Sequence, residues 1–137
     1  MEKYIGVKLI NAELCLNTFN DEGYRITHED GSISWHTKEE FEKSYKKTDG
    51  LKFGLAIEAV KLGEKIARQG WNGKGMFVYY VPENKYPFST EVGKSIADLE
   101  GKVEYGAYIA MKTAQGNVVP WLASQTDVLA EDWLIVE

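Results

Sequence analysis

One amphipathic helix is the strongest structural signal in this sequence. Phe53, Ala56, Ile57 and Val60 follow the i, i+3, i+4, i+7 spacing that places apolar side chains on one face of a helix. Gly63 follows at the position where helices often end on a glycine in the left-handed conformation. A helix with a single apolar face must bury that face, so its neighbours have to provide a packing surface.

Short strands are predicted downstream of this helix. A Gly-rich loop, residues 69–75, separates the first two strands, and Pro82 closes the second. A long polar insertion follows over residues 83–104, within which residues 90–99 are compatible with a helix. Residues 124–130 are expected to form one or two helical turns. The predicted strands are residues 65–68, 76–81, 105–111, 117–120 and 133–136.

A separate pattern of strands precedes the helix. Residues 4–14 alternate in part between apolar and polar side chains, and the hairpin turn at 29–31 offers Gly31 for a positive φ between two further strands, 23–28 and 32–35. A helix is predicted next, over residues 38–46.

Thr37 is a suitable N-cap for that helix, and Glu40 is placed to complete a capping box. Phe41 and Tyr45, four residues apart, are expected on the buried face of the helix.

Together these patterns predict an α+β fold of small antiparallel sheets packed with short helices, in two small modules. A linker at residues 48–50 divides an N-terminal module, residues 1–48, from a second module, residues 51–137. The chain of 137 residues is 44% hydrophobic and 27% charged, a balance typical of globular proteins and not of disordered ones.

Composition excludes several classes of protein. Cys15 is the only cysteine, so the chain has no intrachain disulfide and no thiolate zinc cage. A net charge of −5 argues against DNA or RNA as a partner, because such binding needs a basic face. No apolar run approaches the roughly 20 residues of a membrane span, and the N-terminus lacks the layout of a signal peptide. We therefore expect a cytoplasmic protein with no membrane partner.

Two polar and aromatic blocks, residues 67–76 and 108–133, suggest a binding site for a flat, phosphorylated small molecule. In the first block, the backbone amides of Gly73 and Gly75 can approach an anion, and Lys74 adds a positive charge. The spacing does not match a P-loop. A simple β-turn between two strands explains these glycines equally well.

Trp71 and Trp121 lie beside Asn, Ser and Gln residues, where an indole can stack on a nucleobase. A place in the core is commoner for a single Trp, but two in polar surroundings favour a ligand. Because Trp71 lies in a Gly-rich loop, we expect its removal to leave the fold intact. Trp133 and Trp35 are instead expected in the cores of their modules.

The segment 124–127 is typical of a helix N-terminus, with Ser124 and Asp127 forming a variant of the capping box. Its free amides also suit an anion or a sugar hydroxyl, so we predict a dual role. A catalytic triad is excluded because Ser124 has no His in its module. Asp127, Glu131 and Asp132 are interpreted as solvated carboxylates and not as an acid/base pair.

The histidines do not suggest a metal site either. A site built on His28 and His36 would need a carboxylate partner and closer spacing, so packed or exposed histidines are favoured. We predict no catalytic residue, no metal and no cofactor.

Residues 67–76, followed by the segments 111–114 and 119–133, closely resemble a family of small phage and prophage proteins, the second of the Thoeris anti-defence families. The resemblance covers about residues 51–137. It implies a non-catalytic sponge that sequesters cyclic ADP-ribose-type (glycocyclic ADPR) immune signals, and possibly also cyclic dinucleotides, in the host bacterial cytosol. It also implies a homotetramer with ligand sites between subunits. The N-terminal module resembles another short phage domain.

The resemblance and the chemistry of the two blocks together predict the ligand contacts. Indoles would stack a base, and Phe77 and Tyr79 would form the floor of the pocket. Polar side chains would read ribose and base edges, while lysines and backbone amides would meet the pyrophosphate. The predicted residues are Trp71, Asn72, Gly73, Lys74, Phe77, Tyr79, Lys112, Thr113, Trp121, Ser124, Gln125, Thr126 and Asp127.

Two other functions compete with the sponge. A phage structural or assembly module would use the same aromatic surface as a protein interface. A hydrolase or cyclase acting on ADP-ribose linkages is the weakest alternative, because the two blocks contain neither His nor Cys.

Overall fold

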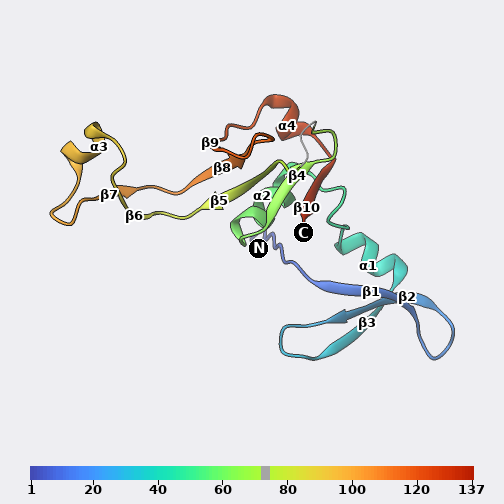
Figure 1. Ribbon diagram of the computed structural model, residues 1–137. Helices are drawn as coiled ribbons and strands as arrows, with labels where there is room; N and C mark the ends of the chain where they lie inside the picture. Colours follow the sequence, from blue (N-terminus) through green and yellow to red (C-terminus); the bar gives the residue numbers. More distant parts are fainter. Residues whose placement is uncertain (72–74) are drawn as a thin grey trace.

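The computed structural model describes residues 1–71 and 75–137, and over these residues the fold is α+β (Figure 1). The N-terminal module contains a three-stranded antiparallel sheet, in the order β1-β2-β3, followed by a short helix. Its elements are β1 (Asn11–Leu16), β2 (Glu22–Thr27), β3 (Ile33–Thr37) and α1 (Lys38–Ser44).

The turn and the Thr37 cap of this module are confirmed, but only the Thr37 half of the predicted capping box is formed. Gly31 has φ +83° between β2 and β3. The Thr37 hydroxyl accepts a hydrogen bond from the Glu40 backbone N–H at 3.3 Å. Phe41 stacks on Tyr24 with 4.0 Å between ring centroids, so α1 packs on the sheet through the predicted residue. The helix is shorter than predicted, because its backbone turns extended at Tyr45.

The first predicted strand is wrong at its N-terminal end. We expected it to begin at Tyr4, whereas β1 begins at Asn11. The partner sets this boundary, because Asn11 pairs with Thr27, the last residue of β2, and no described strand continues beyond it. Trp35 is half-buried and packs closely on Gly23, where any Cβ would clash with the indole.

The second module is built on a five-stranded antiparallel sheet in the order β10-β4-β5-β8-β9. The predicted helix is α2 (Phe53–Lys61), and Gly63 after it has φ +97°, as expected. The strands are β4 (Lys65–Arg68), β5 (Phe77–Val81), β8 (Tyr108–Lys112), β9 (Val118–Pro120) and β10 (Trp133–Val136).

Helix α2 packs against β10, β4 and β5 and covers one face of this sheet. Val60 of the helix and Ile66, Val78 and Trp133 of the strands are fully buried there. The predicted linker is also attached to the sheet, because the Ile135 backbone N–H of β10 donates to the Thr48 backbone oxygen at 2.8 Å. Just after the linker, Leu51 exchanges backbone hydrogen bonds with Trp133 of β10. Ala56 and Val60 of the predicted stripe therefore belong to the core, and Phe53 packs against it. Ile57 is only half-buried and is not part of this cluster, whereas Ala59, outside the predicted stripe, is.

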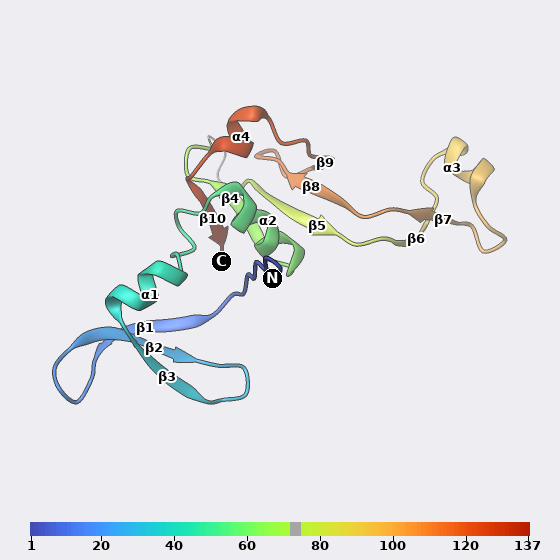
Figure 2. The same ribbon diagram turned by 180° about the vertical axis from the view of Figure 1, so that it is seen from behind.

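A projecting arm replaces the predicted polar insertion. It is a two-stranded sheet of β6 (Asn84–Pro87) and β7 (Lys102–Tyr105), with helix α3 (Glu91–Ile96) at its tip. Both views show it extending away from the five-stranded sheet beyond β5 and β8 (Figures 1 and 2). We had predicted a single strand from residue 105, but Tyr105 belongs to β7 and β8 begins at Tyr108. None of the described helices is long and apolar enough to cross a membrane.

Candidate ligand-binding site

The two faces of the five-stranded sheet carry different side chains. Successive residues of a strand point to opposite faces, and Phe77 is paired with Lys112 across β5 and β8. Ile66, Val78 and Trp133 face α2, and we call this the helix face. Their neighbours along the strands point away from α2, and we call that side the open face.

Phe77 lies on the open face between two lysines. The Lys65 Nζ lies 5.3 Å from the centroid of the Phe77 ring, and the Lys112 Nζ lies 5.8 Å from it. Tyr79 is the next residue of β5 on this face, with its ring centroid 5.9 Å from that of Phe77. Two ammonium groups beside a pair of half-buried aromatic rings offer both positive charge and a flat apolar surface.

The end of the Gly-rich loop is tied to this cluster. Lys112 donates a hydrogen bond from Nζ to the Gly75 backbone oxygen at 3.1 Å. Gly75 has φ +75°, and a Cβ there would lie 3.1 Å from the same Nζ. The backbone conformation therefore favours glycine at this position, whereas the Lys112 ammonium could shift to make space for a Cβ. Asn72, Gly73 and Lys74, predicted to contact the ligand, lie outside the described residues.

Trp71 and Trp121 lie on the helix face, in a cluster of aromatic rings around Trp133. Trp133 is 0% exposed, as predicted for a core residue. The centroid of its ring system is 5.5 Å from that of Trp71 and 5.9 Å from that of Trp121, both edge-on. Our expectation that Trp71 stands outside the core is wrong, because the backbone after β4 folds its half-buried indole onto Trp133. The stacking roles of Trp71 and Trp121 stay predictions.

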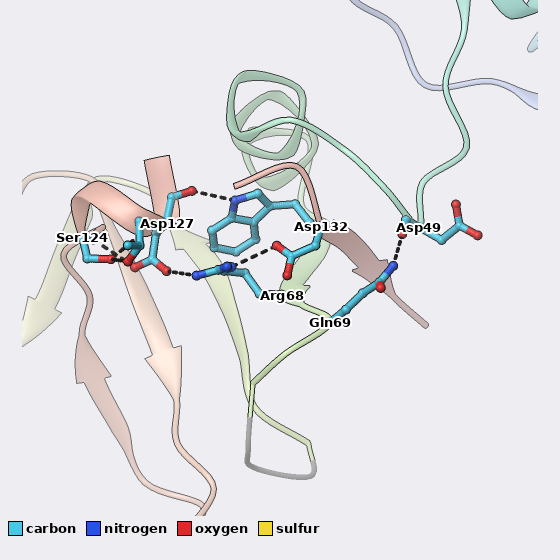
Figure 3. A network of polar contacts seen from close by, with 8 residues as sticks. Asp49, Arg68, Gln69, Ser124, Asp127 and Asp132 are labelled. Carbon is cyan, nitrogen blue, oxygen red and sulfur yellow. Dashed lines mark hydrogen bonds and ion pairs between the residues drawn. The ribbon is translucent and has the colours of Figure 1, made fainter. Parts of the chain in front are cut away.

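A polar network holds α4 (Gln125–Leu129) against the end of β4 (Figure 3). Arg68 donates from Nε to Asp132 Oδ1 at 3.0 Å and from Nη1 to Asp127 Oδ1 at 3.1 Å. The other oxygen of Asp127 accepts the Ser124 backbone N–H at 2.9 Å, and the Ser124 hydroxyl accepts the Asp127 N–H at 3.1 Å. The predicted capping box is confirmed.

This network shifts the acidity of its members. Partial burial opposes ionisation of Asp127, but hydrogen bonds from Ser124 and the neighbouring Arg68 outweigh it, and the pKa of Asp127 is lowered. Hydrogen bonds to Asp132 and Asp127 raise the pKa of the Arg68 guanidinium, so it remains charged. Asp127 is thus an ionised carboxylate whose two oxygens are both engaged by the protein.

Two of the three carboxylates at this end of the chain are partly buried and paired with an arginine, which corrects our interpretation of all three as solvated. Asp127 and Asp132 pair with Arg68, whereas Glu131 is exposed and lies 3.7 Å from Lys52. Sequence reasoning missed Arg68, because its partners are 59 and 64 residues away. Only the order of the strands brings them together.

The remaining predicted contacts are exposed or lie in turns. Thr113 begins the turn between β8 and β9, where its N–H donates to the Asn117 backbone oxygen at 2.9 Å. Gln125 and Thr126 lie in the exposed first turn of α4, and Thr126 hydrogen-bonds the Ser124 hydroxyl at 2.8 Å. The structure thus divides the predicted residues between the open face, the helix face and the start of α4.

The fold is therefore that of a small α+β protein with polar and aromatic side chains on both sides of a five-stranded antiparallel sheet. The family model described as Tad2-like, Thoeris anti-defense 2-like domain, matches residues 51–136 of this chain, and the protein belongs to that family. The family is named for anti-defence and not for an enzymatic activity.

A phage relative supports the same family. The protein named Thoeris anti-defense 2 from Bacillus phage SP01 is 38% identical over 86 residues, which cover 63% of this chain and 94% of the relative. The residues matched by the family model include the five-stranded sheet, α2 and the arm.

Proposed function

We propose that this protein is a phage anti-defence sponge that binds a cyclic ADP-ribose-type immune signal in the host cytosol and holds it intact. Membership of the Thoeris anti-defense 2-like family supports the biological role. The observation that carries the chemistry is Phe77, flanked on the open face by Lys65 and Lys112. This arrangement matches a ligand that combines flat rings with a pyrophosphate.

The physical roles follow from the geometry. Phe77 and Tyr79 offer aromatic surface, and stacking on a nucleobase is typically worth about 1–3 kcal/mol. Lys65 and Lys112 supply the counter-charge for a pyrophosphate as mobile ammonium groups. The chain's net charge of −5 does not oppose this, because local charges set the potential of a small site.

The division of the predicted residues supports a site between subunits. Phe77 and Lys112 lie on the opposite side of the sheet from Trp71, Trp121 and the start of α4. One chain therefore cannot bring both groups to the same ligand. We propose that the open face of one subunit and the α4 region of another form the two walls, as symmetric assemblies allow.

Exposed apolar side chains at the tip of the arm also favour assembly. Val92, Ile96 and Leu99 around α3 are 75%, 68% and 108% exposed. Apolar groups gathered on a protruding element commonly mark an interface. We propose a homotetramer in which the arms contact neighbouring subunits. Light scattering on the purified protein tests this, and a monomer that still binds the signal tightly would contradict it.

The decisive experiment is recovery of the bound ligand. The protein is incubated with cyclic ADP-ribose isomers, washed and heat-denatured, and the released nucleotide is analysed by mass spectrometry. An intact signal supports the sponge, whereas a cleaved product would replace it with an enzyme. Calorimetric titration with the same isomers and with cyclic dinucleotides then defines the ligand class.

The same apolar arm supports one alternative, a phage structural or assembly module. Such a module would use Val92, Ile96 and Leu99 to bind a virion protein and would have no nucleotide site. Absence of any heat of binding with every nucleotide, together with co-purification of virion proteins, would favour this alternative.

A further inference from the structure

A cavity in the described structure lies away from both the open face and the α4 region. It has a volume of about 550 Å³, within the range of small-molecule sites. One wall is formed by residues 6–10, which precede β1, and a second by Ser44, Tyr45, Lys46 and Thr48. The third consists of α2 with its flanking residues and Ile135 of β10. Both views place the N-terminus next to α2 and the C-terminus (Figures 1 and 2).

The lining combines aliphatic side chains with positive charge. Leu51, Leu55, Ala59 and Leu62 provide the wall on the side of α2, and Val7 and Leu9 face them from the N-terminal segment. The described residues that line the cavity include two lysines, Lys8 and Lys46, and no Asp or Glu. In a chain with 21 acidic and 16 basic residues, a lining whose charged side chains are all cationic is a specific feature.

We propose that this cavity is a second ligand site, for an amphipathic anion with an aliphatic body such as a medium-chain carboxylate. Branched aliphatic walls accept a flexible hydrocarbon chain, and burying each CH₂ contributes about 0.8 kcal/mol. Lys8 and Lys46 neutralise the carboxylate at the margin. The site needs both modules, because residues 6–10 and 44–48 lie outside the family match of 51–136.

The cavity gives the N-terminal module a role that the nucleotide site does not require. Residues 1–10 make no backbone–backbone hydrogen bond within the described chain, and residues 1–9 are exposed, although residues 6–10 border the cavity opposite α2. An occupant of the cavity would tie this segment to the second module. Ligand binding should therefore protect residues 1–10 from proteolysis.

The test uses the full chain and octanoate below its micellar concentration, followed by calorimetric titration. Octanol and octyltrimethylammonium serve as the neutral and cationic probes of equal chain length. We expect octanoate to bind at least about tenfold more tightly than either, because only the anion pairs with the lysines. Equal affinity for all three probes would overturn the proposal.

Variants locate the site. Lys8→Glu and Lys46→Glu should each weaken octanoate binding by about three- to tenfold, as expected for reversal of an exposed charge. Lys47→Glu is the matched control, since Lys47 is exposed and does not line the cavity. Leu62→Trp, at an exposed position of the wall, should fill the cavity and abolish binding without unfolding the core.

The outcomes remain distinct from those of the proposed nucleotide site. Each variant is also titrated with the cyclic ADP-ribose signal and checked by thermal denaturation. Loss of octanoate binding with an unchanged melt and unchanged nucleotide affinity, if the protein binds that signal at all, supports a separate cavity site. Unchanged octanoate affinity in Lys8→Glu, Lys46→Glu and folded Leu62→Trp would show that the probe binds elsewhere and overturn the assignment.

Discussion

The two faces of the five-stranded sheet use the same residue types for different purposes. On the helix face, Trp71 and Trp121 surround the fully buried Trp133. On the open face, Phe77 and Tyr79 stand beside two lysines, and the core cluster of the described residues does not extend over them. Aromatic residues in polar surroundings therefore do not by themselves indicate ligand stacking. What decides their role is which face of the sheet their strand or loop presents.

The largest expected effect is on the helix face. Trp133→Ala removes a fully buried indole and its hydrogen bond from Nε1 to the Asp127 backbone oxygen, 2.9 Å long. We expect a loss of about 3–5 kcal/mol in the free energy of unfolding, typical of large aromatic truncations in a core. Chemical denaturation measures it, with Trp133→Phe as the milder control. Wild-type stability in Trp133→Ala would contradict the assignment of Trp133 to the core.

Trp71→Ala should also destabilise the protein, by about 2 kcal/mol, because half-burial limits the packing that is lost. The residue contacts Trp133 edge-on, and Trp71→Phe should recover part of the loss. Denaturation and nucleotide titration on the same samples separate stability from binding. Wild-type stability with lost binding would restore Trp71 as a stacking residue outside the core.

Phe77→Ala should affect nucleotide binding more than stability, the opposite of what we expect for Trp71→Ala. We expect nucleotide affinity to fall by about 1–3 kcal/mol, roughly five- to 150-fold, from the loss of a stacking surface. Stability should change less than in Trp71→Ala, because Phe77 is half-buried on the face away from α2. Calorimetric titration and thermal melts provide the comparison, with Phe77→Tyr as control. Unchanged affinity would place the ligand away from the open face.

The smallest expected effect concerns pH. Arg68→Met should lower the melting temperature at pH 7 by a few degrees, since it removes the partner of two carboxylates. The pKa of Asp127 is lowered in the folded protein, so its stabilising contribution is present above its ordinary value near 3.9 and disappears as pH falls through the folded pKa.

Wild type and Arg68→Met should therefore converge in stability below about pH 4, as Asp127 becomes protonated. Melting temperatures measured from pH 7 to pH 2 test this, with Lys52→Met as a control for an exposed ion pair. A constant difference between the two proteins at every pH would contradict a contribution from Asp127.

Sequence alone determined the local elements of this protein. The spacing of Phe53, Ala56 and Val60 predicted α2, and Gly63 predicted its end, because helix periodicity and a left-handed glycine depend only on neighbouring residues. The capping box of Ser124 and Asp127 was readable for the same reason. Strands β4 and β10 have the predicted bounds, because each is a short, largely apolar run with clear ends in the sequence.

Only the tertiary structure decided where those elements meet. The pairing of β1 with β2 set the start of β1, and the hairpin of β6 and β7 turned a polar insertion into an arm. Arg68 hydrogen-bonds Asp127 and Asp132 because the order of the strands in the sheet brings together residues that are far apart in the sequence. Sequence spacing alone does not predict these contacts. The same long-range packing placed Trp71 on the helix face and Phe77 on the open face, which local pattern does not encode.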